Sequence, residues 1–279
     1  MRSRHHCGCQ LRHLCVFASV LLEGRRNVRN VTFCGGKPVY VPLRPPPSAG
    51  SQNVSSKEST LDIAELEAAL TPNSKVIITT TPHNPVGKVF TVDELKAIGK
   101  IAQGHNLLII ADEVPHTRIA SLSAQLWSRT VSVGSAGKSF AATDWRIGWC
   151  IGPAAPLRPL TAAMTRITFC AVIPLQEALA AGFAAAEKEH FFEAQRDQYM
   201  ARRDLLLGFL NQLGLPYTAV CVRLISFNFA LSNKKQSLFP FPDNRPDGSY
   251  FVLVETSKVK IPPEFEILEL INLKSALDF

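Results

Sequence analysis

Residues 131–150 read VSVGSAGKSFAATDWRIGWC, and this stretch decides how the rest of the chain is interpreted. Its β-branched start at Val131 and Val133 predicts a short buried strand, and small residues then lead to a single lysine, Lys138. Small residues let a ligand approach the backbone closely. Apolar and aromatic neighbours favour the neutral form of an amine, which a Schiff base requires. Eight residues further on, Arg146 carries a rigid guanidinium that suits a phosphate.

The segments around this stretch alternate between strand and helix patterns. Short apolar or β-branched runs at 75–80, 107–111, 130–133 and 147–151 predict four strands. Thr91 and Glu94 form a capping box that predicts a helix up to Gly104. Such alternation predicts an α/β fold, in which a mostly parallel sheet has helices on both faces. After the last strand, 156–182 predicts two helices with a break near Pro174, and 187–213 predicts one long helix.

Polar residues stand where two of these strands end. Asn84, followed by Pro85 and Gly87, lies in a loop directly after the strand at 75–80. Asp112 and Glu113 follow the strand at 107–111. Open α/β sheets bind their ligands at the carboxyl ends of the strands, so this edge is the expected site.

These residues together resemble a known family. The pattern S-A-G-K-x-F-x-x-T-x-W-R-x-G-W, which begins at Ser135, resembles the cofactor-lysine motif of class I/II aminotransferases, fold type I of the pyridoxal-phosphate enzymes. Its first six positions are similar to the kynurenine aminotransferase (cysteine-S-conjugate β-lyase) branch. Asn84-Pro-x-Gly and Asp112 precede it in the family's order. The resemblance covers about 35–217 and 247–263, and it implies a three-layer α-β-α large domain with an incomplete small α+β domain.

The resemblance also implies roles for five residues around pyridoxal 5′-phosphate. Lys138 would hold the cofactor as a Schiff base and then shuttle the α-proton of the substrate. Asp112 would pair with the pyridine nitrogen, and Asn84 would donate to the phenolic oxygen. Ser135 and Arg146 would bind the phosphate. Taken singly, four of them have an ordinary structural explanation: Lys138 as a solvated turn residue, Asp112 as a strand-end cap or exposed loop residue, Asn84 as a turn residue and Arg146 as an arginine stacked on the neighbouring tryptophans.

The implied function is transfer of an amino group from an L-amino acid (kynurenine-like, glutamine or similar) to a 2-oxo acid. Its partners are these small molecules, and the family implies a homodimer. The alternative is an inactive homologue, truncated at both ends, that keeps part of the cofactor site. Proline at position 115 replaces the usual tyrosine and supplies no hydroxyl, and Asp144 replaces a glycine beside the phosphate-binding residues. The substrate-binding arginine has no match, since Arg223 and Arg245 lie in an apparent insertion.

The resemblance divides the chain into three expected regions. Residues 1–30 form an atypical extension that we expect to be disordered; 31–185 form the large, cofactor-binding domain; 186–279 form a long helix and a partial small domain, with the insertion at about 218–246. The extension is arginine-rich and acid-poor, and it weakly resembles a mitochondrial presequence, although a signal peptide is also conceivable. The cytoplasm and the mitochondrion are both expected compartments.

Composition argues against several other classes of protein: nucleic-acid-binding, membrane-bound and metal-binding proteins. The chain of 279 residues carries a formal net charge of +7, concentrated near its start, so we expect no nucleic-acid surface. No apolar run reaches the roughly 18 residues of a membrane span, so we expect no membrane contact. The seven scattered cysteines indicate neither a disulfide framework nor a zinc site, and we expect no metal. A phosphate-binding P-loop ending at Lys138 requires a glycine where Ser132 stands.

Overall fold

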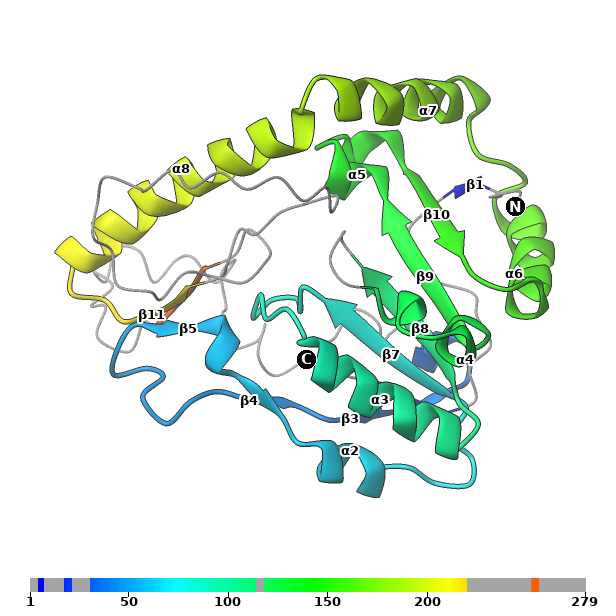
Figure 1. Cartoon of the computed structure of the whole chain (residues 1–279), viewed down its shortest axis with the longest axis horizontal. Coiled ribbons are helices and arrows are strands. Elements are labelled where there is room, and N and C mark those ends of the chain that lie inside the picture. The colour runs from blue at the N-terminus through cyan, green and yellow to red at the C-terminus, as the bar shows by residue number, and fades with distance from the viewer. Residues whose placement is uncertain (1–4, 8–17, 22–30, 114–117, 220–251, 256–279) are drawn as a thin grey trace, which may run out of the picture.

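The fold is organised around one seven-stranded sheet. The computed structural model describes residues 5–7, 18–21, 31–113, 118–219 and 252–255. In sheet order the strands are β1 (His5–Cys7), β10 (Ile147–Ile151), β9 (Thr130–Ser135), β8 (Leu108–Glu113), β7 (Val76–Thr81), β2 (Ala18–Leu21) and β3 (Lys37–Tyr40). The strands from β9 to β3 are parallel, whereas β10 is antiparallel to both of its neighbours (Figure 1). The predicted α/β fold with a mostly parallel sheet is confirmed.

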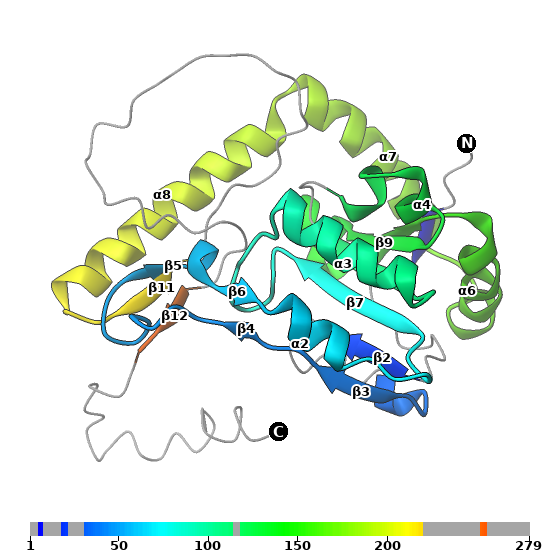
Figure 2. The same ribbon diagram turned by 60° about the horizontal axis from the view of Figure 1, so that its bottom comes forward.

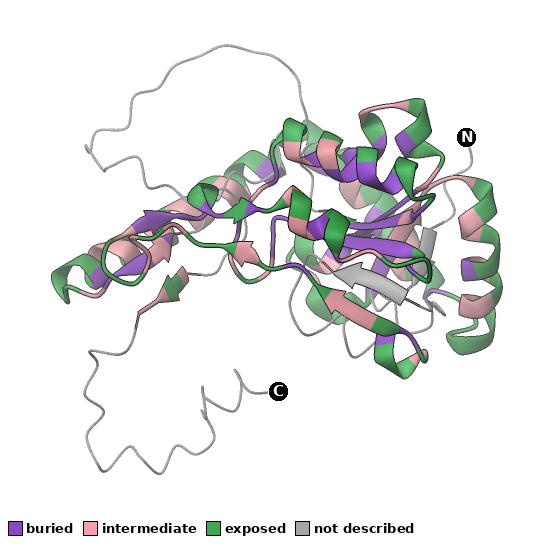
Figure 3. Ribbon diagram, turned by 90° about the horizontal axis from the view of Figure 1, so that it is seen from below, coloured by how far each residue is buried: buried purple, intermediate pink, exposed green. Residues whose placement is uncertain are grey.

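Helices α2 (Ile63–Ala68), α3 (Val92–Gly104) and α4 (Ala124–Trp127) cover one face of the sheet, together with the short η2 (Ile119–Ser121). The predicted capping box is present, because Thr91 Oγ accepts from the Glu94 amide and the Glu94 side chain accepts from the Thr91 amide. Leu95, Ile98 and Ala102 lie on the inner side of α3 and are almost fully buried. They pack against Ile77, Ile109 and Ala111 of the sheet, and Figure 3 shows this buried band between exposed helix surfaces. On the other face, Val31 joins Val76, Ile78, Ile110 and Val133 in a second cluster.

The chain after β10 forms three longer helices. They are α6 (Ala154–Ile167), α7 (Ile173–Lys188) and α8 (Phe191–Gln212). The break predicted near Pro174 is confirmed, since this proline stands in the first turn of α7. The long helix predicted over 187–213 is confirmed as α8, but it begins four residues later than predicted, because the chain turns at His190, which has a left-handed φ of 50°. In the described parts of the chain, no helix is both long enough and apolar enough to cross a membrane.

Helix α8 runs from the large sheet to a smaller one (Figure 2). That sheet has the order β12 (Val252–Val254), β11 (Tyr217–Ala219) and β5 (Val54–Ser55), and the short η1 (Ser56–Glu58) follows β5. The two-stranded β4 (Leu43–Arg44) and β6 (Thr60–Leu61) connect this region with α2. The helix predicted from Thr60 begins at Ile63 instead, because the Asp62 side chain caps it.

Two strands lie inside the predicted disordered extension. β1 pairs with the edge of β10, and β2 lies between β3 and β7. These seven residues add two strands to the sheet, and the disorder expected over the rest of 1–30 stays a prediction. Most of the apparent insertion at 218–246 lies outside the described residues, as do Arg223 and Arg245. The domain limits at 30 and 185 stay predictions.

Candidate active site

The five predicted site residues gather at one edge of the large sheet. Parallel β7, β8 and β9 end at this edge, and antiparallel β10 begins there. The register aligns Thr80 with Asp112, Asp112 with Val133, and Ser135 with Gly148. The five residues follow from this arrangement: Asn84 comes just after β7, Asp112 lies near the end of β8, Ser135 ends β9, Lys138 follows in α5 (Ala136–Ser139), and Arg146 precedes β10.

Asp112 carries the carboxylate of this edge. The residue is open to solvent, but protein surrounds the carboxyl on its other sides, and this burial raises its pKa. The positive charge of Lys138 acts in the opposite direction and lowers the pKa of Asp112. The two side chains are therefore close enough to interact electrostatically, although they lie on different strand ends.

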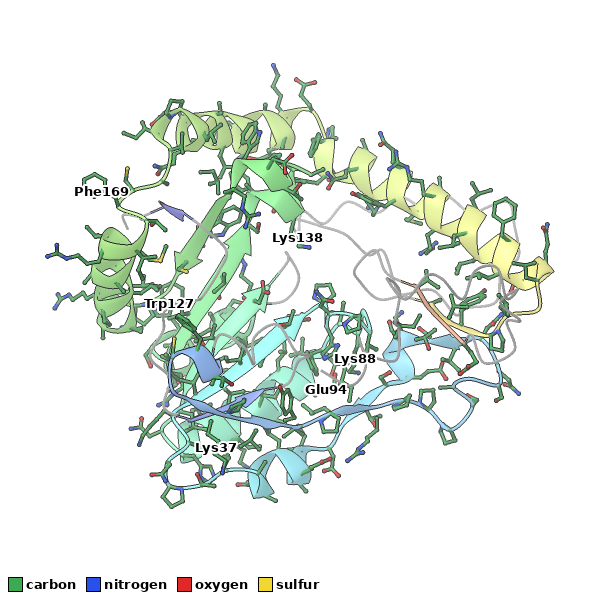
Figure 4. The ribbon with its side chains drawn as sticks, turned by 180° about the vertical axis from the view of Figure 1, so that it is seen from behind. Lys37, Lys88, Glu94, Trp127, Lys138 and Phe169 are labelled. Carbon is green, nitrogen blue, oxygen red and sulfur yellow. The ribbon has the colours of Figure 1, made fainter. Side chains whose placement is uncertain are left out.

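Lys138 owes its direction to the way α5 packs. Ala136 and Ser139 are buried in this single turn, whereas Lys138 is exposed. Figure 4 shows the lysine side chain pointing away from α7 toward the middle of the molecule. Directly after the turn, the ring of Phe140 packs on three aromatic rings at the junction of α7 and α8: Phe183 at 4.9 Å, Phe192 at 5.3 Å and Phe191 at 5.7 Å between centroids. The buried side of α5 thus fixes the exposed lysine.

Two glycines are needed for this shape. A Cβ on Gly137 would come within 3.0 Å of the Thr143 Cα and 3.4 Å of the Ser135 Oγ, so the chain after Lys138 folds back closely on α5. A Cβ on Gly134 would overlap the indole of Trp149, which lies across it from the neighbouring strand. A larger residue at Gly137 would displace the backbone at Thr143, and one at Gly134 would displace the Trp149 indole.

Ser135 and Arg146 lie at the same end of the β9–β10 hairpin. Ser135 is half-buried and stands opposite Gly148 in the register. Arg146 is exposed, has a left-handed φ of 53°, and donates from Nη1 to the Thr143 carbonyl at 3.0 Å. Asp144 is also exposed, on the short η3 (Thr143–Trp145) two residues before Arg146. The proline at 115 lies outside the described residues.

Asn84 is held in a closed loop after β7. The His83 amide donates to the Lys88 carbonyl at 2.7 Å, and the Gly87 amide donates to the His83 carbonyl at 2.6 Å. Asn84 lies inside this ring and is half-buried. Lys88 received no role from the sequence, yet its side chain is buried and ion-paired with Glu94. The sequence contains one indication of this ion pair, which is that Lys88 stands six residues before the capping-box glutamate Glu94.

Glu113 is a second residue whose place the sequence did not reveal. A strand-end acid reads as a cap or an exposed loop residue, but Glu113 is buried. Its Oε1 accepts from the Ile119 amide and its Oε2 from Ser132 Oγ, both at 2.9 Å. Burial raises the pKa of Glu113, and these two hydrogen bonds lower it. The carboxylate therefore joins β9 to the chain that returns after residue 117, next to Asp112.

The residues present fit pyridoxal phosphate. An amine, a carboxylate, an amide, a hydroxyl and a guanidinium gather at one edge, and these are the groups that its aldehyde, pyridine nitrogen, phenolic oxygen and phosphate require.

A family model described as aminotransferase class I and II matches residues 28–259. The chain belongs to this family. It is 42% identical over 261 residues to the probable kynurenine–oxoglutarate transaminase BNA3 of Saccharomyces cerevisiae, covering 90% of this chain and 53% of that protein. It is 33% identical over 243 residues to kynurenine–oxoglutarate transaminase 3 of Mus musculus, covering 82% of this chain and 47% of the relative. The chain thus spans about half the length of the curated relatives it matches.

Solved structures of this aminotransferase family share the fold. The crystal structure of Bna3p from Saccharomyces cerevisiae superposes with a TM-score of 0.78 at 38% identity, over 97% of this chain and 62% of Bna3p. The predicted fold of the family is confirmed by this match.

Proposed function

We propose that this chain binds pyridoxal 5′-phosphate at the carboxyl edge of its sheet and serves an aminotransferase reaction. The observation that carries the proposal is the placing of Lys138 and Asp112, on two different strand ends, within electrostatic range of each other. Membership of the class I and II family supports the same cofactor. When bound, the cofactor supplies an aldehyde that receives amino groups and a ring that withdraws electrons from the α-carbon.

The residues of the chain would divide the work between binding and proton transfer. The Lys138 amine would form the covalent link and then carry the proton on and off the substrate α-carbon, as a general base and acid. The Asp112 carboxylate would keep a proton on the pyridine nitrogen, because a negative charge beside that nitrogen favours its protonated form. Asn84 would orient the ring, and Ser135 with Arg146 would hold the phosphate through charge-assisted hydrogen bonds.

For the substrates we propose an L-amino acid of the kynurenine type as donor and 2-oxoglutarate as acceptor. The names of the BNA3 and mouse relatives support this pair. The purified chain, supplied with cofactor, L-kynurenine and 2-oxoglutarate, is then expected to form L-glutamate. Cofactor bound at Lys138 without glutamate from any donor would favour the alternative of an inactive homologue.

We also propose a homodimer, as the family resemblance implies. The region between α6 and the first residue of α7 supports it, because Phe169, Val172 and Ile173 are more than half exposed there. Light scattering of the purified chain is expected to give twice the monomer mass, and a strictly monomeric mass at all concentrations would contradict it.

For the compartment we propose the cytoplasm or the mitochondrion. The arginine-rich, acid-poor start of the chain supports the mitochondrial choice. An import assay with isolated mitochondria separates the two, since only a presequence gives uptake that depends on the membrane potential.

A further inference from the structure

Lys88 is buried to an extent unusual for a lysine. Only 3% of its surface is exposed, and it is the one buried lysine among the residues that the structure describes. Its Nζ lies 3.0 Å from Glu94 Oε1, donates to the Lys57 carbonyl at 3.5 Å, and lies 6.0 Å from the centroid of the Phe90 ring. The ammonium thus joins the loop after β7 to the start of α3 and to η1.

Glu94 is itself fixed by the helix that it caps. Its Oε2 accepts from the Thr91 amide at 2.8 Å, while its own amide donates to Thr91 Oγ1 at 3.2 Å. One carboxylate therefore closes the start of α3 and receives the Lys88 ammonium. Figure 4 shows Lys88 and Glu94 next to each other, with Lys138 on α5 in the same view.

This anchor lies at the end of the Asn84 loop. The Lys88 carbonyl accepts from the His83 amide at 2.7 Å, so the backbone of Lys88 closes the ring that contains Asn84. At its far end the Phe90 amide donates to Thr81 Oγ1 at 3.4 Å. Any movement of Lys88 away from Glu94 would consequently carry Asn84 with it.

Stability alone does not account for a charge pair at this place. The buried Lys88 ammonium loses its hydration and the partly exposed Glu94 carboxylate loses some of its own, and apolar residues of similar volume often replace a buried ion pair without loss of stability. Apolar residues do not reproduce the directional geometry of the pair. An ion pair with hydrogen bonds favours a single position of the loop. A fixed position matters for Asn84 because its side chain would have to meet a ligand that residues at the ends of β8 and β9 and at the start of β10 also hold.

We propose that Lys88, held by Glu94, is a positioning residue that sets the place of Asn84 for cofactor binding. The inference rests on the proposed function, because Asn84 needs a fixed place only if a cofactor binds at this edge. Lys88 is expected to touch neither cofactor nor substrate.

The test uses the double variant Lys88→Met/Glu94→Gln in the full chain. Methionine and glutamine keep the volumes and the cap but remove both charges, so the variant is expected to melt close to the wild type. Hydrogen exchange of the cofactor-free protein, followed by mass spectrometry on peptides covering 82–91, is expected to be faster than in the wild type. Cofactor affinity, measured by absorbance titration, is expected to fall about tenfold, the loss of one well-aligned hydrogen bond.

The single variant Lys88→Met and the control Lys75→Met complete the experiment. Lys88→Met leaves the Glu94 charge without its partner, and it is expected to melt lower than the double variant. Lys75 is exposed at the opposite end of β7, and its replacement is expected to change neither exchange nor affinity. Exchange and affinity equal to the wild type in the double variant would overturn the role of Lys88. Failure of the wild type to bind cofactor at Lys138 would instead overturn the proposed function, while the exchange data still decide whether the pair fixes the loop.

Discussion

Lys88 follows β7 and Lys138 follows β9, two strands of the sheet that β8 separates, and the surroundings of the two lysines differ. In the loop after β7, Lys88 is buried and committed to Glu94 at 3.0 Å. In the turn after β9, Lys138 is exposed on a helix whose other side is buried. The ion pair keeps the Lys88 side chain in one place, whereas the exposed side chain of Lys138 is able to reach a ligand.

The two lysines therefore have different tasks at this edge: Lys88 is structural, and Lys138 is the proposed reactive group. In the loop after β7, the lysine itself stabilises the conformation of the backbone. In the turn after β9, Gly134, Gly137 and Phe140 stabilise the conformation, and Lys138 remains accessible. The following predictions test this division, beginning with the largest expected effect.

Lys138→Ala is expected to abolish covalent attachment of pyridoxal phosphate, because among the lysines that the structure describes Lys138 is the exposed one whose charge acts on Asp112. The visible Schiff-base absorbance and the label fixed by borohydride report the loss. Lys37→Ala, an exposed lysine on β3, is the matched control and is expected to keep the full label. Equal labelling of the two variants would remove the distinction between the two lysines.

Asp112→Asn is expected to weaken cofactor binding about 10- to 100-fold, the effect of one charge-assisted hydrogen bond. Burial raises the pKa of Asp112 above its ordinary value of 3.8, so the folded protein binds this proton more tightly than the unfolded chain. The wild type should therefore lose stability as the pH rises from the ordinary range of Asp through the raised pKa.

The asparagine variant lacks this titration, and above that window its free energy of unfolding should exceed that of the wild type. Denaturant unfolding between pH 3 and pH 8 measures the difference. Asp93→Asn, an exposed acid in the first turn of α3, serves as the control for affinity. A pH profile shared by Asp112→Asn and the wild type would contradict the account of this carboxyl.

Phe140→Ala is expected to lower the free energy of unfolding by about 2 kcal/mol, less than for a fully buried ring because Phe140 is half-buried. It should also weaken cofactor binding about tenfold, since the α5 turn loses its contact with the junction of α7 and α8. Phe169→Ala removes a ring that is 81% exposed and should change neither quantity. Unchanged affinity in Phe140→Ala would show that the aromatic cluster does not hold Lys138.

Asp144→Gly is expected to raise cofactor affinity about threefold, because an exposed negative charge near Arg146 opposes a phosphate only weakly in water. Asp144→Asn separates the charge from the backbone effect, and it should give most of the gain. Equal or weaker binding in both variants, measured by the same titration, would refute the view that Asp144 opposes the phosphate.

The sequence predicted the central strands, because β-branched runs such as the one that ends at Thr81 favour a buried strand. It also predicted that the polar residues after these strands lie at one edge of the sheet, because parallel strands end at the same edge. It did not predict the turn at His190, where neither glycine nor proline stands. There the packing of Phe191 and Phe192 on Phe140 outweighs local helix propensity.

The burial of charged residues was equally hidden from the sequence. The sequence did not predict the burial of Lys88 and Glu113. Only tertiary partners (Glu94 for the lysine, Ser132 and Ile119 for the acid) make this burial acceptable. The strands β1 and β2 were missed because His5–Cys7 and Ala18–Leu21 are too short to carry a periodic signal.

The most direct test of the central claim is to map the cofactor on the wild-type chain. The purified protein is mixed with pyridoxal phosphate, reduced with borohydride, digested and analysed by mass spectrometry. Label confined to Lys138 is the predicted result, and it would establish the sheet edge as the cofactor site. Label on Lys88, label spread over surface lysines, or no label would contradict the claim.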